Sequence, residues 1–298
     1  MEDPGSTQHV IGGLFALGAA VCWASASILF SRLGKGGVSS LGMNLGKGLA
    51  ALPCIVVALA LTGWPAPDRS WIWLAASGLV GITIGDTVFF RTLKRLGPRR
   101  TLLMTTLIPV CVALMSVGLL GERLPALGWV GAALCSAGVT WTMWERMDVG
   151  ASGGSWRGGL GYGLLTVVSC AAAVILAKVG LSEASPMEAT LVRLGAGVAG
   201  LLLLGLFRRE VGSWLAPFRA PRLLGVLVIA AVVGTFLGIW FSMASLWYTT
   251  ATVATVLGSM DPVFVLPLAA LFAGEKVSFR AVLGALVAVA GVALLMTR

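Results

Sequence analysis

Four ionisable residues stand inside long apolar stretches of the sequence: Lys47, Asp86, Arg193 and Asp261. Moving such a group into the hydrocarbon of a bilayer costs about 2.5–3.5 kcal/mol on insertion scales. An ionisable residue in an apolar span therefore indicates a cavity or an oppositely charged partner. Charge pairing and proton transfer are the chemistry that these four side chains can supply.

Lys47 and Arg193 occupy matching positions, each about six residues, or about 9 Å, into an apolar stretch at 1.5 Å rise per residue. This depth is within reach of the membrane interface for an extended side chain. Two interpretations stay open. Either each side chain keeps its charge in water, or each places a fixed cation at one mouth of a pathway, able to hold the carboxylate of a substrate.

Asp86 lies near the centre of its stretch, after Gly81 and Gly85, whose small size lets another helix approach. Asp261 is predicted in mid-helix directly before Pro262, whose missing N–H leaves a carbonyl unpaired in the preceding turn. Both acids are candidates for proton coupling or for contact with a substrate ammonium group. The alternative is a buried structural acid paired with Lys or Arg.

Three tryptophans lie far enough inside the apolar stretches to line a cavity: Trp23, Trp240 and Trp247. An indole ring in a cavity can stack on a ring of a substrate. For any one of them, a lipid-facing or packing role is the commoner one.

The sequence offers little for catalysis. Its single histidine, His9, precedes the first apolar stretch, and no HExxH motif, paired intramembrane acids or phosphate-binding loop occurs. The five cysteines lie singly in apolar stretches, without the spacing of a zinc site. We therefore expect no enzyme, no metal site and no cofactor, and the lack of a polar filter motif argues against a channel.

The composition indicates that lipid, not water, surrounds most of the chain. Hydrophobic residues make up 58% and charged residues 11%, whereas a soluble domain carries about 25% charged residues. A membrane-spanning helix needs about 20 residues to cross the roughly 30 Å hydrocarbon core. Ten stretches qualify: 10–33, 41–63, 71–95, 101–120, 125–144, 158–180, 187–207, 222–247, 251–273 and 279–297.

The sequence repeats itself at a spacing of 153 residues, at which 107–143 align without a gap on 260–296. Acidic residues number only 12, so the recurrence of a Gly-Glu pair argues against chance. At this spacing the repeated positions are Pro109 and Pro262, Gly121 and Gly274, Glu122 and Glu275, Gly81 and Gly234, Gly85 and Gly238, Gly131 and Gly284, and Gly138 and Gly291. At a second spacing of 146 they are Arg32 and Lys178, Gly34 and Gly180, and Lys47 and Arg193. We expect structural roles for the repeated prolines, glycines and acids. Glu122 and Glu275 each precede a helix, whose N-terminus favours a negative charge.

The repeat divides the chain into 1–149 and 150–298, joined by a polar Gly/Ser-rich segment. Five helices per half is an odd number, so the second half enters the membrane with the opposite orientation. The fold class predicted is an all-α polytopic membrane protein of ten transmembrane helices, arranged as two inverted five-helix repeats around a central cavity.

A mid-helix proline, a Gly-Glu pair at the following turn and a glycine-spaced helix occur twice in this chain. The pattern resembles the EamA repeat of the drug/metabolite transporter superfamily, and the resemblance covers essentially the whole chain. In length and layout the chain is most similar to the YddG-type amino-acid exporters.

This resemblance implies a secondary transporter that exports aromatic or other neutral amino acids across the bacterial inner membrane by alternating access. A drug, cation or nucleotide-type metabolite transporter of the same fold is the alternative. The implied partners are a small-molecule substrate, the lipid bilayer and protons as a coupling ion. A monomer and a homodimer are both compatible with the resemblance, and no cofactor is implied.

The basic residues gather on one side of the predicted membrane segments. Of 21 Lys and Arg residues, fifteen lie in or beside the loops after odd-numbered stretches, four lie on the side of the termini, and two lie within spans. This placement of the +9 net charge in short loops indicates contact with anionic lipid headgroups rather than a nucleic-acid partner. The positive-inside rule puts the odd loops in the cytoplasm and both termini outside. The resemblance implies the opposite, with both termini cytoplasmic.

We follow the charges, because short loops are where the positive-inside rule works best. A reporter that is active only in the cytoplasm, fused after Arg298, is expected to give no signal. A strong signal from that fusion would show that the termini are cytoplasmic and that the charge count misleads.

Overall fold

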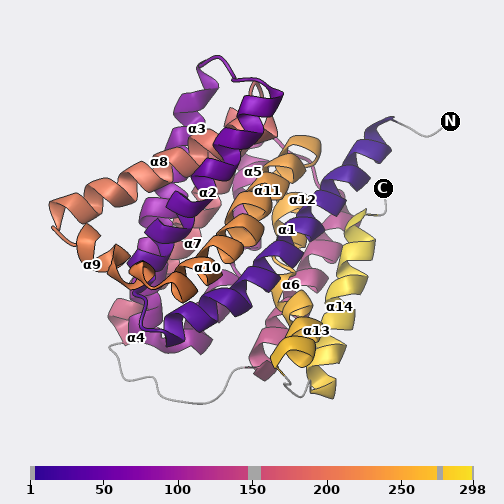
Figure 1. Cartoon of the computed structure of the whole chain (residues 1–298). Coiled ribbons are helices and arrows are strands. Elements are labelled where there is room, and N and C mark those ends of the chain that lie inside the picture. Colours follow the sequence, from indigo (N-terminus) through magenta and orange to yellow (C-terminus); the bar gives the residue numbers. More distant parts are fainter. Residues whose placement is uncertain (1–3, 147–155, 274–277, 297–298) are drawn as a thin grey trace.

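The computed structural model describes residues 4–146, 156–273 and 278–296, which form helices and short connections with no β-strand among them (Figure 1). The first half contains α1 (Pro4–Lys35), α2 (Ser40–Thr62), α3 (Ser70–Gly78), the π-helical turn η1 (Leu79–Gly85), α4 (Asp86–Thr105), α5 (Ile108–Leu120) and α6 (Ala126–Arg146). The second half contains α7 (Trp156–Gly180), α8 (Pro186–Phe207), α9 (Val211–Leu215), η2 (Ala216–Arg219), α10 (Pro221–Ala230), the π-helical turn η3 (Ala231–Leu237), α11 (Gly238–Tyr248), α12 (Ala251–Gly258), α13 (Asp261–Ala273) and α14 (Phe279–Met296).

Eight of the described helical segments are long and apolar enough to cross a membrane. They are Thr7–Gly34, Ser40–Thr62, Ser70–Thr92, Gly159–Gly180, Pro186–Phe207, Pro221–Tyr248, Ala251–Leu268 and Phe279–Met296. Two shorter apolar helices, Ile108–Leu120 and Ala126–Thr142, lie within the predicted stretches 101–120 and 125–144. The all-α polytopic membrane fold is therefore confirmed. Helices suit this setting because they satisfy backbone hydrogen bonds within the segment, where lipid offers none.

The repeated prolines open helices rather than lying in the middle of them. α5 begins at Ile108 and α13 begins at Asp261, so Pro109 and Pro262 fall in the first turn of each helix. A proline there removes no needed hydrogen bond, because N–H groups of the first turn have no partner within the helix. The prediction of mid-helix prolines is wrong. The helix breaks at 106–107 and 259–260 nevertheless recur at the predicted spacing.

α4 continues through a segment that the sequence predicts as a loop, Gly97-Pro98-Arg99-Arg100. An interior proline costs about 3 kcal/mol, and packing against α7 on both sides of the segment offsets this cost. Added Cβ atoms at Gly159 and Gly163 of α7 would collide with Leu96 and Met104 of α4, so these glycines admit the two side chains. Tertiary contacts thus override the local turn signal.

The π-helical turns η1 and η3 lie at matching places in the two halves, beginning 152 residues apart. An added Cβ at Gly81 in η1 would lie 2.8 Å from the Cβ of Ala173 in α7, and one at Gly234 in η3 would collide with the Cβ of Ala26 in α1. Each π-helical turn therefore packs on the first helix of the other half. The two alanines are 147 residues apart, so the register there is one residue longer than the predicted 146.

α6 and α14 lie side by side at the lower right of Figure 1 and pack backbone against backbone. An added Cβ at Gly131 would lie 2.9 Å from the carbonyl oxygen of Gly291, and one at Gly138 would lie 2.6 Å from that of Gly284. Because Gly131 corresponds to Gly284 and Gly138 to Gly291 in the repeat, the contact is reciprocal, as two-fold symmetry requires. The pairing also shows that α6 and α14 run antiparallel.

Alanine substitution at Gly138 is expected to lower the melting temperature of the purified protein, because the new methyl group meets the α14 backbone. The matched control is Gly118→Ala in α5, where an added Cβ meets no atom within 4 Å. That variant is expected to be neutral or stabilising, because alanine is preferred over glycine in helices by about 0.5–1 kcal/mol. Equal melting temperatures for the two variants would contradict the close approach of α6 and α14.

Candidate functional site

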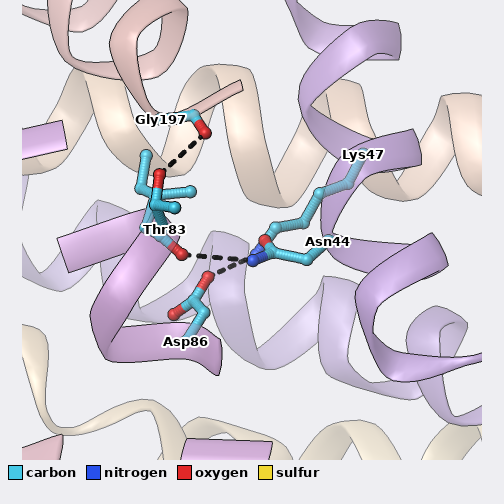
Figure 2. Close-up of polar contacts among 6 residues, drawn as sticks. Asn44, Lys47, Thr83, Asp86 and Gly197 are labelled. Atoms are coloured by element: carbon cyan, nitrogen blue, oxygen red, sulfur yellow. Dashed lines mark hydrogen bonds and ion pairs between the residues drawn. The ribbon is translucent and has the colours of Figure 1, made fainter. Parts of the chain in front are cut away.

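An ion pair between α2 and the start of α4 stands inside the membrane-spanning region (Figure 2). The Nζ atom of Lys47 lies 3.5 Å from Oδ2 of Asp86, and the two side chains are 27% and 32% exposed. The pair is therefore neither fully buried nor facing away from the protein. It satisfies the expectation that an acid within a span pairs with a basic residue, and its exposed portion leaves both charges accessible to a ligand.

The turn η1 positions Asp86, which follows it directly. Asn44 of α2 donates through Nδ2 to the carbonyl oxygen of Ile82 at 3.3 Å, and Thr83 donates through Oγ1 to the carbonyl oxygen of Gly197 in α8 at 3.1 Å (Figure 2). These bonds fix η1 between α2 of the first half and α8 of the second. π-helical turns are frequent at functional sites because they re-aim side chains within a helix.

Arg193 of α8 places a second cation beside η1, and the described residues put no carboxylate oxygen within 4.0 Å of its guanidinium. An added Cβ at Gly81 would lie 3.4 Å from Nη2 of Arg193, so that glycine makes room for the guanidinium. Nη1 lies 3.9 Å from the sulfur of Met243, and the buried Nε has no hydrogen-bond partner among the described residues. Two cations thus lie close to η1 and one of them pairs with Asp86, while part of the arginine's hydrogen-bonding capacity is unused.

The structure separates Asp261 from these residues and changes its setting. Asp261 is the first residue of α13, after the helix break at 259–260, whereas the sequence predicts it in mid-helix. Because α12 ends at Gly258 and α13 begins at Asp261, Pro262 does not interrupt a continuous helix and so does not leave a carbonyl unpaired in the middle of one. A carboxylate at a helix N-terminus is stabilised by the helix dipole.

An aromatic cavity of about 570 Å³ lies where α2 and α11 end and α8 begins. It is lined by Trp240 and Trp247 together with Phe15, Trp64 and Tyr248. The rings of Phe15 and Tyr248 are stacked, with centroids 5.9 Å apart. The third predicted tryptophan, Trp23, packs with its indole nitrogen against Gly238 instead.

A second cavity, of about 320 Å³, lies where α2 begins and α8 ends. Its lining includes Ser39, Thr87, Arg91, Arg208 and Glu210. Since α2 runs from this cavity to the aromatic one, the two cavities lie at opposite ends of a membrane-spanning helix.

Glu122 has a structural role at a helix N-terminus, but the helix is not the one that follows it in sequence. Its Oε1 accepts from the backbone N–H of Ala251, the first residue of α12 in the other half, at 2.7 Å. Lys178 of α7 donates to two carbonyl oxygens at the end of α11, those of Leu246 in its last turn and of Thr249, the residue that follows the helix. The break between α11 and α12 is therefore held by an acid on one side and a base on the other, each with the favourable sign for its helix end.

The remaining repeat positions divide between described and undescribed parts of the chain. Gly121 ends α5 with φ +65°, a left-handed conformation that glycine adopts without strain. Gly274 and Glu275 lie outside the residues that the structure describes.

Sequence reasoning missed Asn44, Thr83 and Lys178. The first two left a signal, because each is a polar residue within an apolar stretch. The partners of Lys178 could not be inferred from its position in the repeat.

Comparisons with known proteins agree on the family. The sequence model described as the EamA-like transporter family matches residues 10–144 and 157–297. An uncharacterised transporter of Archaeoglobus fulgidus is 28% identical over 95% of this chain and 97% of its own length. An uncharacterised transporter of a Sinorhizobium species, named from the cobO 3' region, is 31% identical over 40% of this chain and 87% of its own length.

A protein of known crystal structure shares the fold with a TM-score of 0.76 at 17% identity, covering 95% of this chain and 96% of that one. The two segments that match the family's sequence model cover nearly all of the described helices and both residues of the Lys47–Asp86 ion pair. The chain belongs to the EamA-like transporter family, within the drug/metabolite transporter superfamily, and is an integral membrane transporter.

Proposed function

We propose that this transporter exports aromatic or other neutral amino acids by alternating access across the bacterial inner membrane. The observation that carries the proposal is the cluster of Lys47, Asp86 and Arg193 at the contact between the two halves. An amino acid carries one carboxylate and one ammonium group. The ammonium group complements Asp86, and the carboxylate complements the cations, of which the cluster has one more than it has acids.

The same charge balance argues against the alternative of a cationic drug. Such a substrate would bring a third positive charge to a site with a single carboxylate, at a low effective dielectric where like charges repel strongly. The aromatic cavity supports a ring-bearing substrate, because Trp240 and Trp247 offer stacking surfaces at one end of α2.

We further propose the ten-helix inverted repeat as the architecture of this transport. Three observations support it: the family's sequence model matches the chain twice, the helix breaks recur at 153 residues, and α6 and α14 make a reciprocal antiparallel contact. Inverted repeats allow one arrangement of helices to open toward either side of the membrane around a central site.

Transport in liposomes should depend on both members of the ion pair. Lys47→Ala and Asp86→Asn are each expected to lower the initial rate of L-phenylalanine transport at least about tenfold, the loss that follows from removing one charge-assisted contact. Arg69→Ala, in the exposed loop after α2, is the matched control and should leave the rate unchanged. Wild-type rates in both folded pair variants would exclude the pair from the pathway.

Asp86 and Asp261 are also the proposed residues for proton coupling. In the same liposomes, replacing a proton-carrying acid by Asn is expected to remove the pH dependence of the transport rate, because an amide does not titrate. Comparing Asp86→Asn with Asp261→Asn identifies the acid that carries the proton. An unchanged pH dependence in both variants would remove proton coupling through these acids.

Substrate analogues test the proposed class directly. L-Phenylalanine, 3-phenylpropanoate and 2-phenylethylamine share a phenyl ring but differ in their charged groups. As inhibitors of L-phenylalanine transport, the amino acid is expected to be the strongest and the amine the weakest. Only the amine lacks a carboxylate, and the cluster has one cation more than it has acids. Preferential transport of the amine would instead assign the protein to the cationic-drug class.

A further inference from the structure

The two end cavities occupy equivalent places in the repeat. Ser39 of the charged cavity and Ser185 of the aromatic one are 146 residues apart, and Thr87 and Trp240 are 153 residues apart. Both spacings are those of the repeat. The cavities are therefore counterparts, one at each end of the spanning helices.

Their chemistry differs although their positions correspond. At the aromatic end, Phe15 stacks on Tyr248. At the charged end, the guanidinium carbon of Arg95 lies 4.8 Å from the ring centroid of Tyr162. Tyr162 follows Phe15 by 147 residues and Tyr248 follows Arg95 by 153, so a cation replaces one ring of the stacked pair. The two contacts therefore occupy corresponding places in the repeat, but the contact at the charged end joins a cation to a ring instead of two rings.

Three charged side chains line the charged cavity, and their balance is positive: Arg91 and Arg208 against Glu210. Both arginines are exposed, and the described residues place no carboxylate oxygen within 4.0 Å of either guanidinium. The guanidinium carbon of Arg91 lies 6.0 Å from the ring centroid of Tyr162, a contact that leaves its N–H donors free for an anion. Two guanidinium groups without an acidic partner form a donor set for an oxyanion.

We propose that this cavity is an anion-binding site, distinct from the Lys47–Asp86 pair, which takes a carboxylate or phosphate group between Arg91 and Arg208. Its volume of about 320 Å³ lies in the range of small-ligand pockets, about 300–1,000 Å³. A soluble carboxylate metabolite and the phosphate of an anionic lipid headgroup present the same chemistry to it. The aromatic counterpart has no charged side chain in its lining, so the two ends of the transporter differ in the chemical groups that they can bind.

Arginine labelling tests the site without requiring transport. The full-length protein is placed in phosphatidylcholine nanodiscs, treated with phenylglyoxal, and the modification of each arginine is followed by peptide mass spectrometry. Benzoate at ten times its dissociation constant is expected to slow modification of Arg91 and Arg208 about tenfold, because a bound anion shields them for that share of the time. Arg222, exposed at the start of α10, is the internal control and should not be protected. Benzylamine, which has the ring but the opposite charge, should protect none of them.

Two further measurements identify the anion and its contacts. Arg91→Gln is expected to raise about tenfold the benzoate concentration that half-protects Arg208, and Arg222→Gln should leave that concentration unchanged. Phosphatidylglycerol in the nanodisc distinguishes the sources: protection by this lipid, with no added effect of benzoate, assigns the site to a headgroup. Unprotected arginines in both lipid compositions would overturn the proposal. Because no transport is measured, a failure of amino-acid transport remains a separate result.

Discussion

Between α11 and α12 the backbone leaves the helical pattern in the short turn that joins two membrane-spanning segments, so the last carbonyls of one helix and the first N–H groups of the next have no partner within their helix. The chain supplies partners from distant helices instead. Lys178 donates to the carbonyl oxygens of Leu246 and Thr249, and Glu122 accepts from Ala251. This one break thereby ties α7 and the segment that follows α5 to the ends of two other helices. The requirement to satisfy the backbone groups of helix ends thus determines where the charged side chains of this region lie.

The cluster at Lys47, Asp86 and Arg193 contrasts with that break. At the break, the base and the acid each serve a helix end of opposite partial charge, so both are used by the fold itself. In the cluster only Lys47 pairs with the single carboxylate, and Nε of Arg193 has no partner in the described part of the chain. Desolvated charge without full compensation is costly and suits a ligand that completes it. This difference separates the groups that stabilise the fold from those that we assign to transport.

Backbone contacts and cavity linings differ in how much substitution they allow. Gly131, Gly138, Gly284 and Gly291 bring α6 and α14 so close that a single added methyl group would collide with the partner backbone. Such positions tolerate no larger residue, so their spacing persists in both halves. Side chains that face a cavity have no such restriction, and Thr87 can correspond to Trp240 without disturbing the packing. A symmetric scaffold can therefore present different chemistry at its two ends.

The sequence alone was enough to establish that the chain is a helical membrane protein with an internal repeat. Hydropathy over about 20 residues and the spacing of Gly, Pro and Glu are local properties that need no tertiary information. It also singled out Lys47, Asp86 and Arg193, because a charged residue in an apolar stretch is conspicuous wherever it packs. Only the tertiary structure decided which of them meet, that Asp261 begins a helix apart from them, and that Glu122 caps α12 in the other half. Those outcomes depend on how helices from different parts of the sequence pack together, and local periodicity carries no information about the partner that a side chain meets across a helix interface.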